Sequence, residues 1–358
     1  MTKQKIVGIS FDHMHMGDLL RLVQNQPEAE IAGIFDPDTA KMESAIKTFN
    51  IPADRVFTDF DTCMRTTRPD LAILCAATAD HAAYTERLAK YDVHVFVEKP
   101  FAASAADARR MMAAMKPTRK ILAINWPLAW VESHVKAKQL IEQGVIGDLI
   151  EVHFYDGNRG PLYHLADKVE VTPEEVERQK PNSWWYKRAA GGGSLLDYMG
   201  YGATLGTWYM NGEAPLEVTC VVDHTRGIEV DQHSVTVCRY ARGLSKMETR
   251  WGTLTDPWTI QPQPTCGFVF VGTNGTIASP DYASHVTIQT RARPEPTSVP
   301  VDKLPVGRRN AIEYVLGCIT RGEPVSGPLD PELCLTAQRI VDTAALSARE
   351  KRTLALLP

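Results

Sequence analysis

The chain predicts an α/β Rossmann domain with a doubly wound parallel sheet, followed by an α+β domain with a large open antiparallel sheet. Three observations lead to this prediction. In the first third of the chain, short β-branched and aromatic runs alternate with helical patterns. Later, several extended runs follow one another without helices between them. A length of 358 residues also exceeds one ordinary hydrophobic core, so we expect two domains, 1–124 and 125–358.

The composition indicates a globular protein that binds a small molecule. Hydrophobic residues make up 44% of the chain and charged residues 23%. The net charge is −4 and there is no basic run, so neither nucleic acid nor a membrane is expected as a partner. The chain begins its first strand at Lys5 without a signal-peptide pattern, which favours a cytoplasmic protein. Seven scattered cysteines without C-x-x-C pairs favour reduced thiols, and no metal site is predicted.

The first domain is expected to contain five strands joined by helices. The strands share β-branched or aromatic runs and are expected at 5–9, 30–35, 71–75, 93–97 and 121–124. Helical spacing of apolar residues predicts helices over 16–23, 82–90 and 105–116. In such sheets ligands bind beyond the carboxyl ends of the strands, so the residues that follow each strand are the candidates for function.

The second domain shows a different order of elements. Helices are expected over 130–143 and 194–210, with a short capped helix opening at Thr172. The expected strands are 148–155, 216–222, 233–240, 246–251 and 268–271. Asn274-Gly275 indicates a hairpin, and two helices close the chain at 310–320 and 332–349. Consecutive strands of this kind predict antiparallel pairing.

Lys99 is the first candidate for chemistry. It follows the expected strand 93–97, and Pro100 restricts the backbone directly after it. A partly desolvated lysine at the end of a buried strand can bind an oxygen, polarise it and exchange a proton with it. A surface Glu98-Lys99 pair is the competing interpretation.

The first turn carries the candidate cofactor site. Gly8 is followed by Ser10–His13 (Ser10, Phe11, Asp12 and His13), where a dinucleotide-binding turn normally reads G-x-G-x-x-G. The middle glycines are missing, and Asp12 would repel a pyrophosphate unless it points away. Asp36 closes the second strand, where an acid binds ribose hydroxyls. A second acid at Asp38 opposes a 2′-phosphate, so NAD is favoured over NADP; Asp36 could instead only form an Asp-Pro turn.

The chain resembles the glucose-fructose oxidoreductase / inositol dehydrogenase (Gfo/Idh/MocA) family of nicotinamide-dependent sugar and polyol oxidoreductases. The resemblance rests on Glu98-Lys99-Pro100, on the segment 76–97 before it, on Gly144–Gly147 and on Gly191–Asp197. It implies a Rossmann domain, an open antiparallel sheet and a substrate held between them against the nicotinamide. It also implies a homodimer or homotetramer built through the antiparallel sheet.

The resemblance assigns roles to individual residues. Lys99 matches the family's active-site lysine, and the residues around it match positions that line the cofactor. Together with the first turn, the candidate cofactor-binding residues are Gly8, Ser10, Phe11, Asp12, His13, Asp36, Ala76, Ala77, Thr78, His81, Glu98, Lys99 and Asn125. His81 could instead cap the helix that follows it.

The chain departs from the family at its second motif, which reads roughly D-x-G-x-H-x-x-D. Asp197 matches the first acid, but Tyr201 stands at the histidine and Thr204 at the second aspartate. A free tyrosine titrates near ~10. A nearby Lys99 ammonium would lower that pKa, so a Lys99–Tyr201 pair is expected to relay the proton, unless Tyr201 only packs in its helix.

Aromatic and basic residues are expected to form the rest of the substrate pocket. Indole faces suit the C–H faces of a sugar ring, and basic side chains suit hydroxyl or carboxylate groups. The candidate substrate-binding residues are Lys99, Trp126, Arg159, His164, Trp185, Lys187, Asp197 and Tyr201. Each tryptophan could instead belong to the core.

These residues predict an NAD(H)-dependent oxidoreductase that acts on a secondary hydroxyl or carbonyl of a sugar, polyol or related substrate, with Lys99 and Tyr201 as catalytic groups. Two alternatives stay open. One is an enzyme of the glycosidase type that uses bound NAD for transient oxidation followed by elimination. The other is a regulator that binds cofactor and sugar without turnover.

Overall fold

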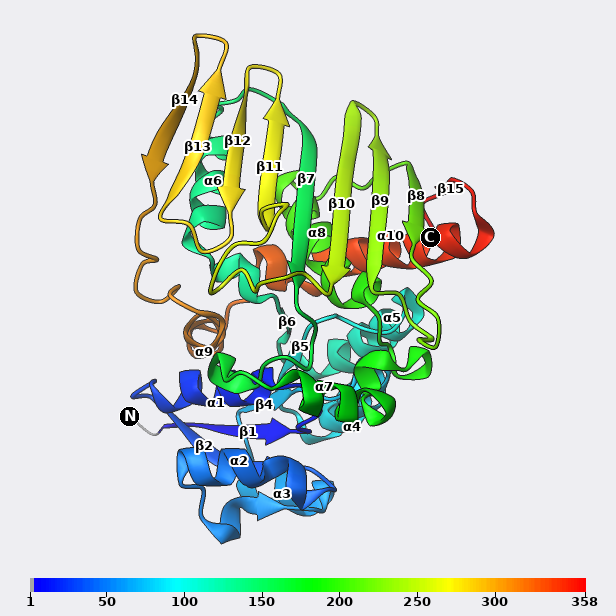
Figure 1. Ribbon diagram of the computed structural model, residues 1–358. Helices are drawn as coiled ribbons and strands as arrows, with labels where there is room; N and C mark the ends of the chain where they lie inside the picture. Colours follow the sequence, from blue (N-terminus) through cyan, green and yellow to red (C-terminus); the bar gives the residue numbers. More distant parts are fainter. Residues whose placement is uncertain (1–2) are drawn as a thin grey trace.

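The computed structural model describes residues 3–358 and contains two sheets (Figure 1). The smaller sheet is parallel and six-stranded, in the order β3-β2-β1-β4-β5-β6. Its strands are β1 (Gln4–Ile9), β2 (Ala29–Phe35), β3 (Val56–Phe57), β4 (Leu71–Leu74), β5 (His94–Glu98) and β6 (Leu122–Asn125). The helices between them are α1 (His15–Gln24), α2 (Thr39–Phe49), α3 (Phe60–Thr67), α4 (His81–Leu88) and α5 (Ala105–Met115). The predicted Rossmann domain is confirmed.

Three elements of this domain were not anticipated from the sequence: α2, β3 and α3. In the sequence, the two helices are marked only by the residues that cap their N-termini. Asp38 accepts a hydrogen bond from the Ala40 amide at the start of α2, and Asp59 accepts one from the Thr62 amide at the start of α3. Both are N-cap aspartates, which satisfy amides that a helix leaves unpaired. β3 is only two residues long and pairs with the end of β2, so no periodic pattern could reveal it.

The larger sheet has the strand order β14-β13-β12-β11-β7-β10-β9-β8-β15. Its strands are β7 (Leu149–Asn158), β8 (Glu217–Val222), β9 (His233–Tyr240), β10 (Gly243–Trp251), β11 (Gly267–Gly272), β12 (Gly275–Pro280), β13 (His285–Thr290), β14 (Arg293–Pro300) and β15 (Leu354–Ala355). The sheet is mixed rather than fully antiparallel, because β7 and β10 run parallel. The long crossover between β7 and β8 allows this exception.

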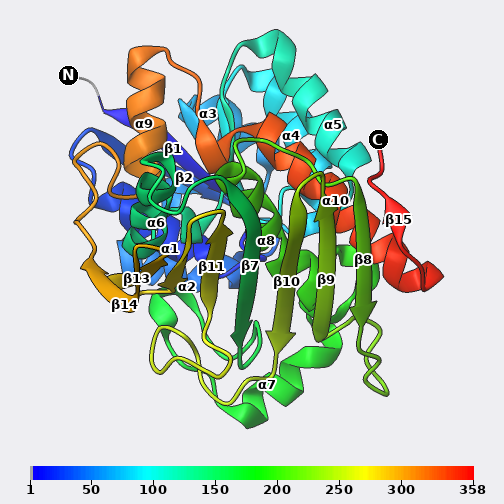
Figure 2. The ribbon, with the colours of Figure 1, turned by 90° about the horizontal axis from the view of Figure 1, so that it is seen from above.

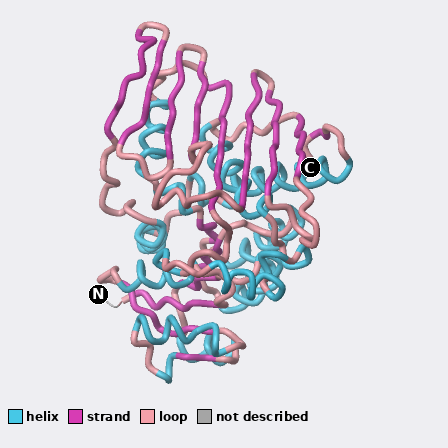
Figure 3. Tube along the Cα trace, in the orientation of Figure 1, coloured by secondary structure: helices cyan, strands magenta, loops and turns pink. Residues whose placement is uncertain are grey.

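Helices cover one face of the larger sheet (Figure 2). They include α6 (Glu132–Glu142), α8 (Ser194–Tyr209) and α10 (Pro331–Glu350), while the short α7 (Pro173–Gln179) lies apart from them near the first domain (Figure 1). Alternating burial along β9 and β10 directs one set of side chains to these helices and leaves the other set on the open face. Figure 3 shows the two groups of strands and the loops between them.

The end of the chain returns to the first domain. The apolar face of α9 (Ala311–Arg321) packs into the same core cluster as Ile6 and Leu20, through residues such as Ile312 and Val315. The Ala105 amide also donates to Asp342 of α10 at 2.7 Å. The late helices therefore fasten the two sheets together and fix the space between them, while the division at 124/125 stays a prediction.

Within residues 3–358, no helix is both long enough and apolar enough to cross a membrane.

Candidate active site

A pocket of about 70 Å³ lies where the carboxyl end of β5 faces the end of β7. Six of the residues singled out from the sequence line it: His13, Lys99, His164, Trp185, Asp197 and Tyr201. They come from the first turn, the end of β5, the loops after β7 and helix α8. The pocket therefore combines both domains, at the edge of the parallel sheet where ligand sites are expected.

Lys99 and Asp197 form a buried ion pair in this pocket. Each residue is 3% exposed, and the Trp251 indole N–H donates to the second oxygen of Asp197 at 3.3 Å. The Lys99 ammonium also lies over the rings of Trp185 at 5.4 Å and Tyr201 at 5.5 Å, within cation–π distance. The pair places a charged donor against aromatic walls, an environment in which one ammonium can hold a substrate oxygen.

Tyr201 does not titrate as the sequence suggested. Its ring lies beneath the Lys99 ammonium and meets Trp126 edge-on at 5.3 Å. Burial raises the pKa of Tyr201 well above its usual range, and the charges of Glu98 and Asp197 raise it further. The expectation of a lowered pKa is wrong, because the ammonium is already paired with Asp197 while the nearby carboxylates oppose a phenolate.

The end of β5 carries a second polar group. Glu98 is 0% exposed; its two oxygens accept from His15 Nδ1 at 2.8 Å and from the Asn125 amide at 2.7 Å. Burial alone would raise the pKa of Glu98, but the charges of His15 and Lys99 and the two hydrogen bonds lower it overall. Burial, together with the positive groups around it, lowers the pKa of His13. His15 was not singled out from the sequence, although its H-x-H spacing with His13 was visible.

Two buried aspartates that were not predicted from the sequence also line the pocket. Asp156 lies near the end of β7 and Asp281 directly after β12. Asp281 accepts from His134 Nε2 at 2.7 Å, inside the protein. Burial and the charges of Asp281 and Asp197 raise the pKa of Asp156 well above its usual range. A raised pKa favours the protonated form of Asp156, which is the form that donates a proton.

Three predicted substrate contacts lie outside this pocket. Trp126 is 2% exposed and packs against α8, where Gly200 leaves room: a Cβ there would be 2.6 Å from the indole. The Arg159 guanidinium is held by the buried carboxylate of Asp256 at 2.8 Å and does not line the pocket. Lys187 is exposed and lies 3.8 Å from Glu229. Sequence alone could not tell a pocket wall from a core tryptophan or a surface ion pair.

His164 and the residues that follow β4 are buried in the protein. Burial lowers the pKa of His164 to about 2, so this pocket residue stays neutral. His81 begins α4, and its two ring nitrogens contact the backbone carbonyls of Phe101 and Ala76. Both nitrogens are therefore used in contacts within the protein. Thr78 is buried beneath Gly191, whose hypothetical Cβ would lie 2.8 Å from Thr78 Cβ. Ala76 and Ala77 lead into this segment and are buried as well.

The first turn fits a dinucleotide at its ribose end. Ser10 has φ of 62°, the left-handed conformation that glycine usually supplies in such turns. Gly8 lets α1 approach the strand, since a Cβ there would lie 3.0 Å from Met16 Sδ. Asp36 follows β2 and its oxygens accept from the Phe11 amide at 2.8 Å and from the Asp38 amide at 2.9 Å. Each oxygen keeps a second lone pair for a hydroxyl.

In the first turn, where a pyrophosphate is expected, the Asp12 carboxylate contacts groups of the protein. Its carboxylate accepts from the Ala77 amide at 3.0 Å and pairs with Lys41 at 2.6 Å. Lys41 lies 29 residues from Asp12 in the chain, so no local pattern relates them; burial lowers the pKa of Lys41, but the Asp12 hydrogen bond and charge raise it overall. The Trp184 indole N–H covers the turn by donating to the Asp12 carbonyl at 3.0 Å. The turn therefore carries no uncompensated negative charge.

Comparison with known proteins matches both domains to one family. Residues 4–126 match the model of the Gfo/Idh/MocA oxidoreductase family with an NAD-binding Rossmann fold, and residues 134–278 match a Gfo/Idh/MocA C-terminal domain.

Two curated proteins with similar sequences carry names of sugar- or polyol-related enzymes. An inositol 2-dehydrogenase of Salmonella paratyphi B is 26% identical over 176 residues, covering 48% of this chain and 51% of its own. A glycosyl hydrolase family 109 protein of Akkermansia muciniphila is 27% identical over 207 residues, covering 55% of this chain and 40% of its own. The chain thus spans about half the length of the curated relatives it matches.

A solved structure shares the whole fold. The aldose-aldose oxidoreductase of Caulobacter crescentus, crystallised with glycerol, superposes with a TM-score of 0.79, 20% identity and coverage of 99% of this chain and 100% of its own. At this identity the likeness concerns the fold. The two family models, which together match residues 4–126 and 134–278, show that the chain belongs to the Gfo/Idh/MocA oxidoreductase family, whose first domain is an NAD-binding Rossmann fold.

Proposed function

We propose that the protein is an NAD(H)-dependent oxidoreductase that acts on a secondary hydroxyl or carbonyl of a sugar, polyol or related substrate. The observation that carries the proposal is the buried Lys99–Asp197 pair, placed at the carboxyl end of β5 in an aromatic pocket. Asp36 and the left-handed turn at Ser10 support a dinucleotide along the first domain.

The pocket residues have distinct tasks in this proposal. When bound, the nicotinamide supplies or receives the hydride. In the direction of carbonyl reduction, the Lys99 ammonium binds the carbonyl oxygen and donates the proton that turns it into a hydroxyl; oxidation returns the proton. Asp197 holds Lys99 in position, and the faces of Trp185 and Tyr201 exclude water from the reacting oxygen. NADP(H) is the less favoured cofactor because the Asp36 carboxylate, at the end of β2, would repel a 2′-phosphate.

A screen over inositols, aldoses and sugar acids, read as NADH absorbance, tests the activity. We expect turnover on at least one substrate, lost in a Lys99→Met variant. Lys120→Met is the matched control, because Lys120 pairs with Asp92 at 3.3 Å far from the pocket. Binding of NADH is measured separately through energy transfer from Trp184 and Trp185, which stack at 3.8 Å beside the first turn. If the protein neither bound NADH nor turned over any substrate, the proposal would be contradicted. If it bound NADH but turned over none of the substrates, the result would favour a regulator.

A second candidate is an NAD-using glycosidase that works by oxidation and elimination. Asp156 favours it, because a buried acid with a raised pKa can protonate the oxygen of a leaving group. This candidate predicts release of nitrophenol from nitrophenyl glycosides without net NADH. Net NADH formation without release would exclude it.

We also infer that the protein is a cytoplasmic homodimer or homotetramer. Four apolar side chains are exposed on strands of the larger sheet: Val221, Val237, Leu244 and Val269. Covering exposed apolar side chains on this sheet face would stabilise an assembly of several copies of the chain. All seven cysteines are free and buried, as expected for a reducing compartment.

A further inference from the structure

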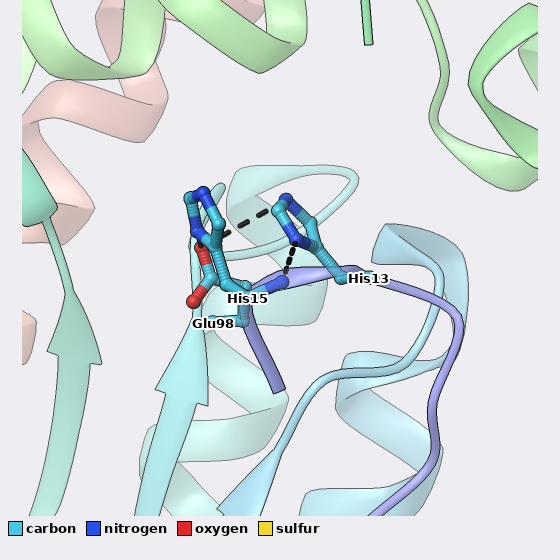
Figure 4. Close-up of side chains that lie close together, drawn as sticks. All are labelled: His13, His15 and Glu98. Atoms are coloured by element: carbon cyan, nitrogen blue, oxygen red, sulfur yellow. Dashed lines mark hydrogen bonds and ion pairs between the residues drawn. The ribbon is translucent and has the colours of Figure 1, made fainter. Parts of the chain in front are cut away.

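The first turn brings two histidines against Glu98, which lies 83 residues from His15 in the chain (Figure 4). His15 Nδ1 lies 2.8 Å and His13 Nε2 3.8 Å from the same oxygen, Oε1 of Glu98. One donor atom from each residue lies within 4.8 Å of the other two. Bonds of about 2.0–2.2 Å from one ion to imidazole nitrogen and carboxylate oxygen require donor atoms at this kind of spacing.

The orientation of His13 is the second observation. His13 is 2% exposed, and its ring lies 4.3 Å from the ring of His15 and 4.8 Å from that of Trp185. Its Nδ1 accepts from the His15 amide at 3.1 Å, whereas its Nε2 is buried without a hydrogen-bond partner. A buried polar atom without a partner costs free energy, and this nitrogen points toward Glu98. An ion between them would give Nε2 a partner.

The charge of Glu98 favours a cation between these three side chains. Its Oε1 faces both imidazoles, and a divalent cation bound there would be attracted by the carboxylate. The Lys99 ammonium, which would repel such an ion, is paired with Asp197.

We propose that His13, His15 and Glu98 bind one divalent transition-metal ion of the zinc, cobalt or manganese class. Two imidazoles and one carboxylate suit these ions, whereas magnesium and calcium prefer oxygen ligands throughout. His13 and His15 both line the pocket, so the open coordination positions face the space next to Lys99. There the ion would bind a substrate hydroxyl or carbonyl oxygen as a Lewis acid. This assignment differs from the expectation from the sequence, in which no metal site is predicted.

Binding has a structural consequence within the first turn. Coordination by His13 Nε2 places the ring proton on Nδ1, so the 3.1 Å hydrogen bond from the His15 amide is given up. Coordination by His15 Nδ1 likewise replaces its hydrogen bond to Glu98. Asn125 keeps its 2.7 Å bond to the other oxygen of Glu98 and continues to orient the carboxylate.

The test uses the full chain, freed of metal with a chelator and without nicotinamide or substrate. We expect Co²⁺ to bind with a stoichiometry of one and to give visible d–d bands, with Zn²⁺ competing for the site in calorimetry. His13→Ala, His15→Ala and Glu98→Gln should each weaken binding at least tenfold. His153→Ala is the matched control, because His153 pairs with Glu151 at 2.9 Å on β7 outside the pocket, and it should bind normally.

Several outcomes would overturn the assignment. These are the absence of Co²⁺ bands in the unmodified protein, binding unchanged in the three variants, or a thiolate-to-cobalt charge-transfer band. The last would place the ion at the buried group of Asp156, Cys266 and Asp281 instead. The presence of Co²⁺ bands is measured on the unmodified protein, so this part of the test does not depend on whether the variants fold. NADH binding, measured on the metal-free chain, reports separately on the proposed oxidoreductase function.

Discussion

Replacing Lys99 by methionine should affect stability and activity for separable reasons. The substitution keeps the length of the side chain but removes the ammonium, which leaves the Asp197 carboxylate without its ionic partner. Both groups are 3% exposed, so solvent does not screen their interaction as it would at the surface. The stranded carboxylate keeps only the Trp251 N–H at 3.3 Å.

The expected loss of stability is large. Removing one partner of a buried ion pair costs about 3–5 kcal/mol, because the other charge stays buried. The remaining indole hydrogen bond places the expected value near the lower end, about 3–4 kcal/mol. At about 2–4 °C per kcal/mol for domains of this size, the melting temperature should fall by about 6–16 °C.

The double variant Lys99→Met/Asp197→Asn separates the two effects. An amide carries no charge, so most of the lost stability should return. Turnover on the true substrate should stay reduced by ~10²-fold or more in both variants, as expected for a missing acid/base group.

Two results would refute this reasoning. A single variant as stable as the unmodified protein would mean that Asp197 is not buried against Lys99. Near-normal turnover by the stable double variant would remove Lys99 from the chemistry and leave the ion pair with a structural role.

Four further outcomes are expected. Asp36→Ala should narrow the preference for NAD(H) over NADP(H) in fluorescence titrations; equal binding of both by the unmodified protein would contradict this prediction. Tyr201→Phe should preserve the shape of the pH–rate profile, because burial and nearby carboxylates keep the pKa of the phenol above its usual range. Loss of the alkaline limb of the profile in this variant would instead support a role for Tyr201 in proton transfer. Burial also raises the pKa of Asp156 above its unfolded value, so its contribution to stability is lost as pH rises through the folded pKa. Urea unfolding should therefore depend less on pH in Asp156→Asn, and an unaltered dependence would count against a protonated Asp156. Val237→Lys, on the open sheet face, should reduce the mass measured by light scattering to that of one chain, whereas a monomeric unmodified protein would refute the interface.

The sequence by itself determined the fold class and predicted the edge of the parallel sheet at which the candidate site lies. The change from alternating strands and helices to consecutive strands is a local pattern, and it identified both sheets. Lys99 could be placed at the pocket because the carboxyl ends of parallel strands meet at one edge of the sheet. His164, Trp185 and Asp197, which are also predicted from the sequence, line the same pocket, and their roles stay predictions.

Only the tertiary structure decided which side chains meet. Asp281 is 125 residues from Asp156, and no local pattern relates them. Trp126 and Trp185 look equivalent in the sequence, yet Trp126 packs under Gly200 in the core while Trp185 faces the pocket. Burial and pairing arise from packing between distant segments, which periodicity does not encode.

The same limit applies to charge. The sequence suggested that Lys99 would lower the pKa of Tyr201, but the ammonium is paired with Asp197 and burial dominates. His13 and His15 are two residues apart in the chain, and only the fold places Glu98 against them. A pKa and a ligand set depend on desolvation and on every charge nearby, so these properties were decided when the two domains packed together.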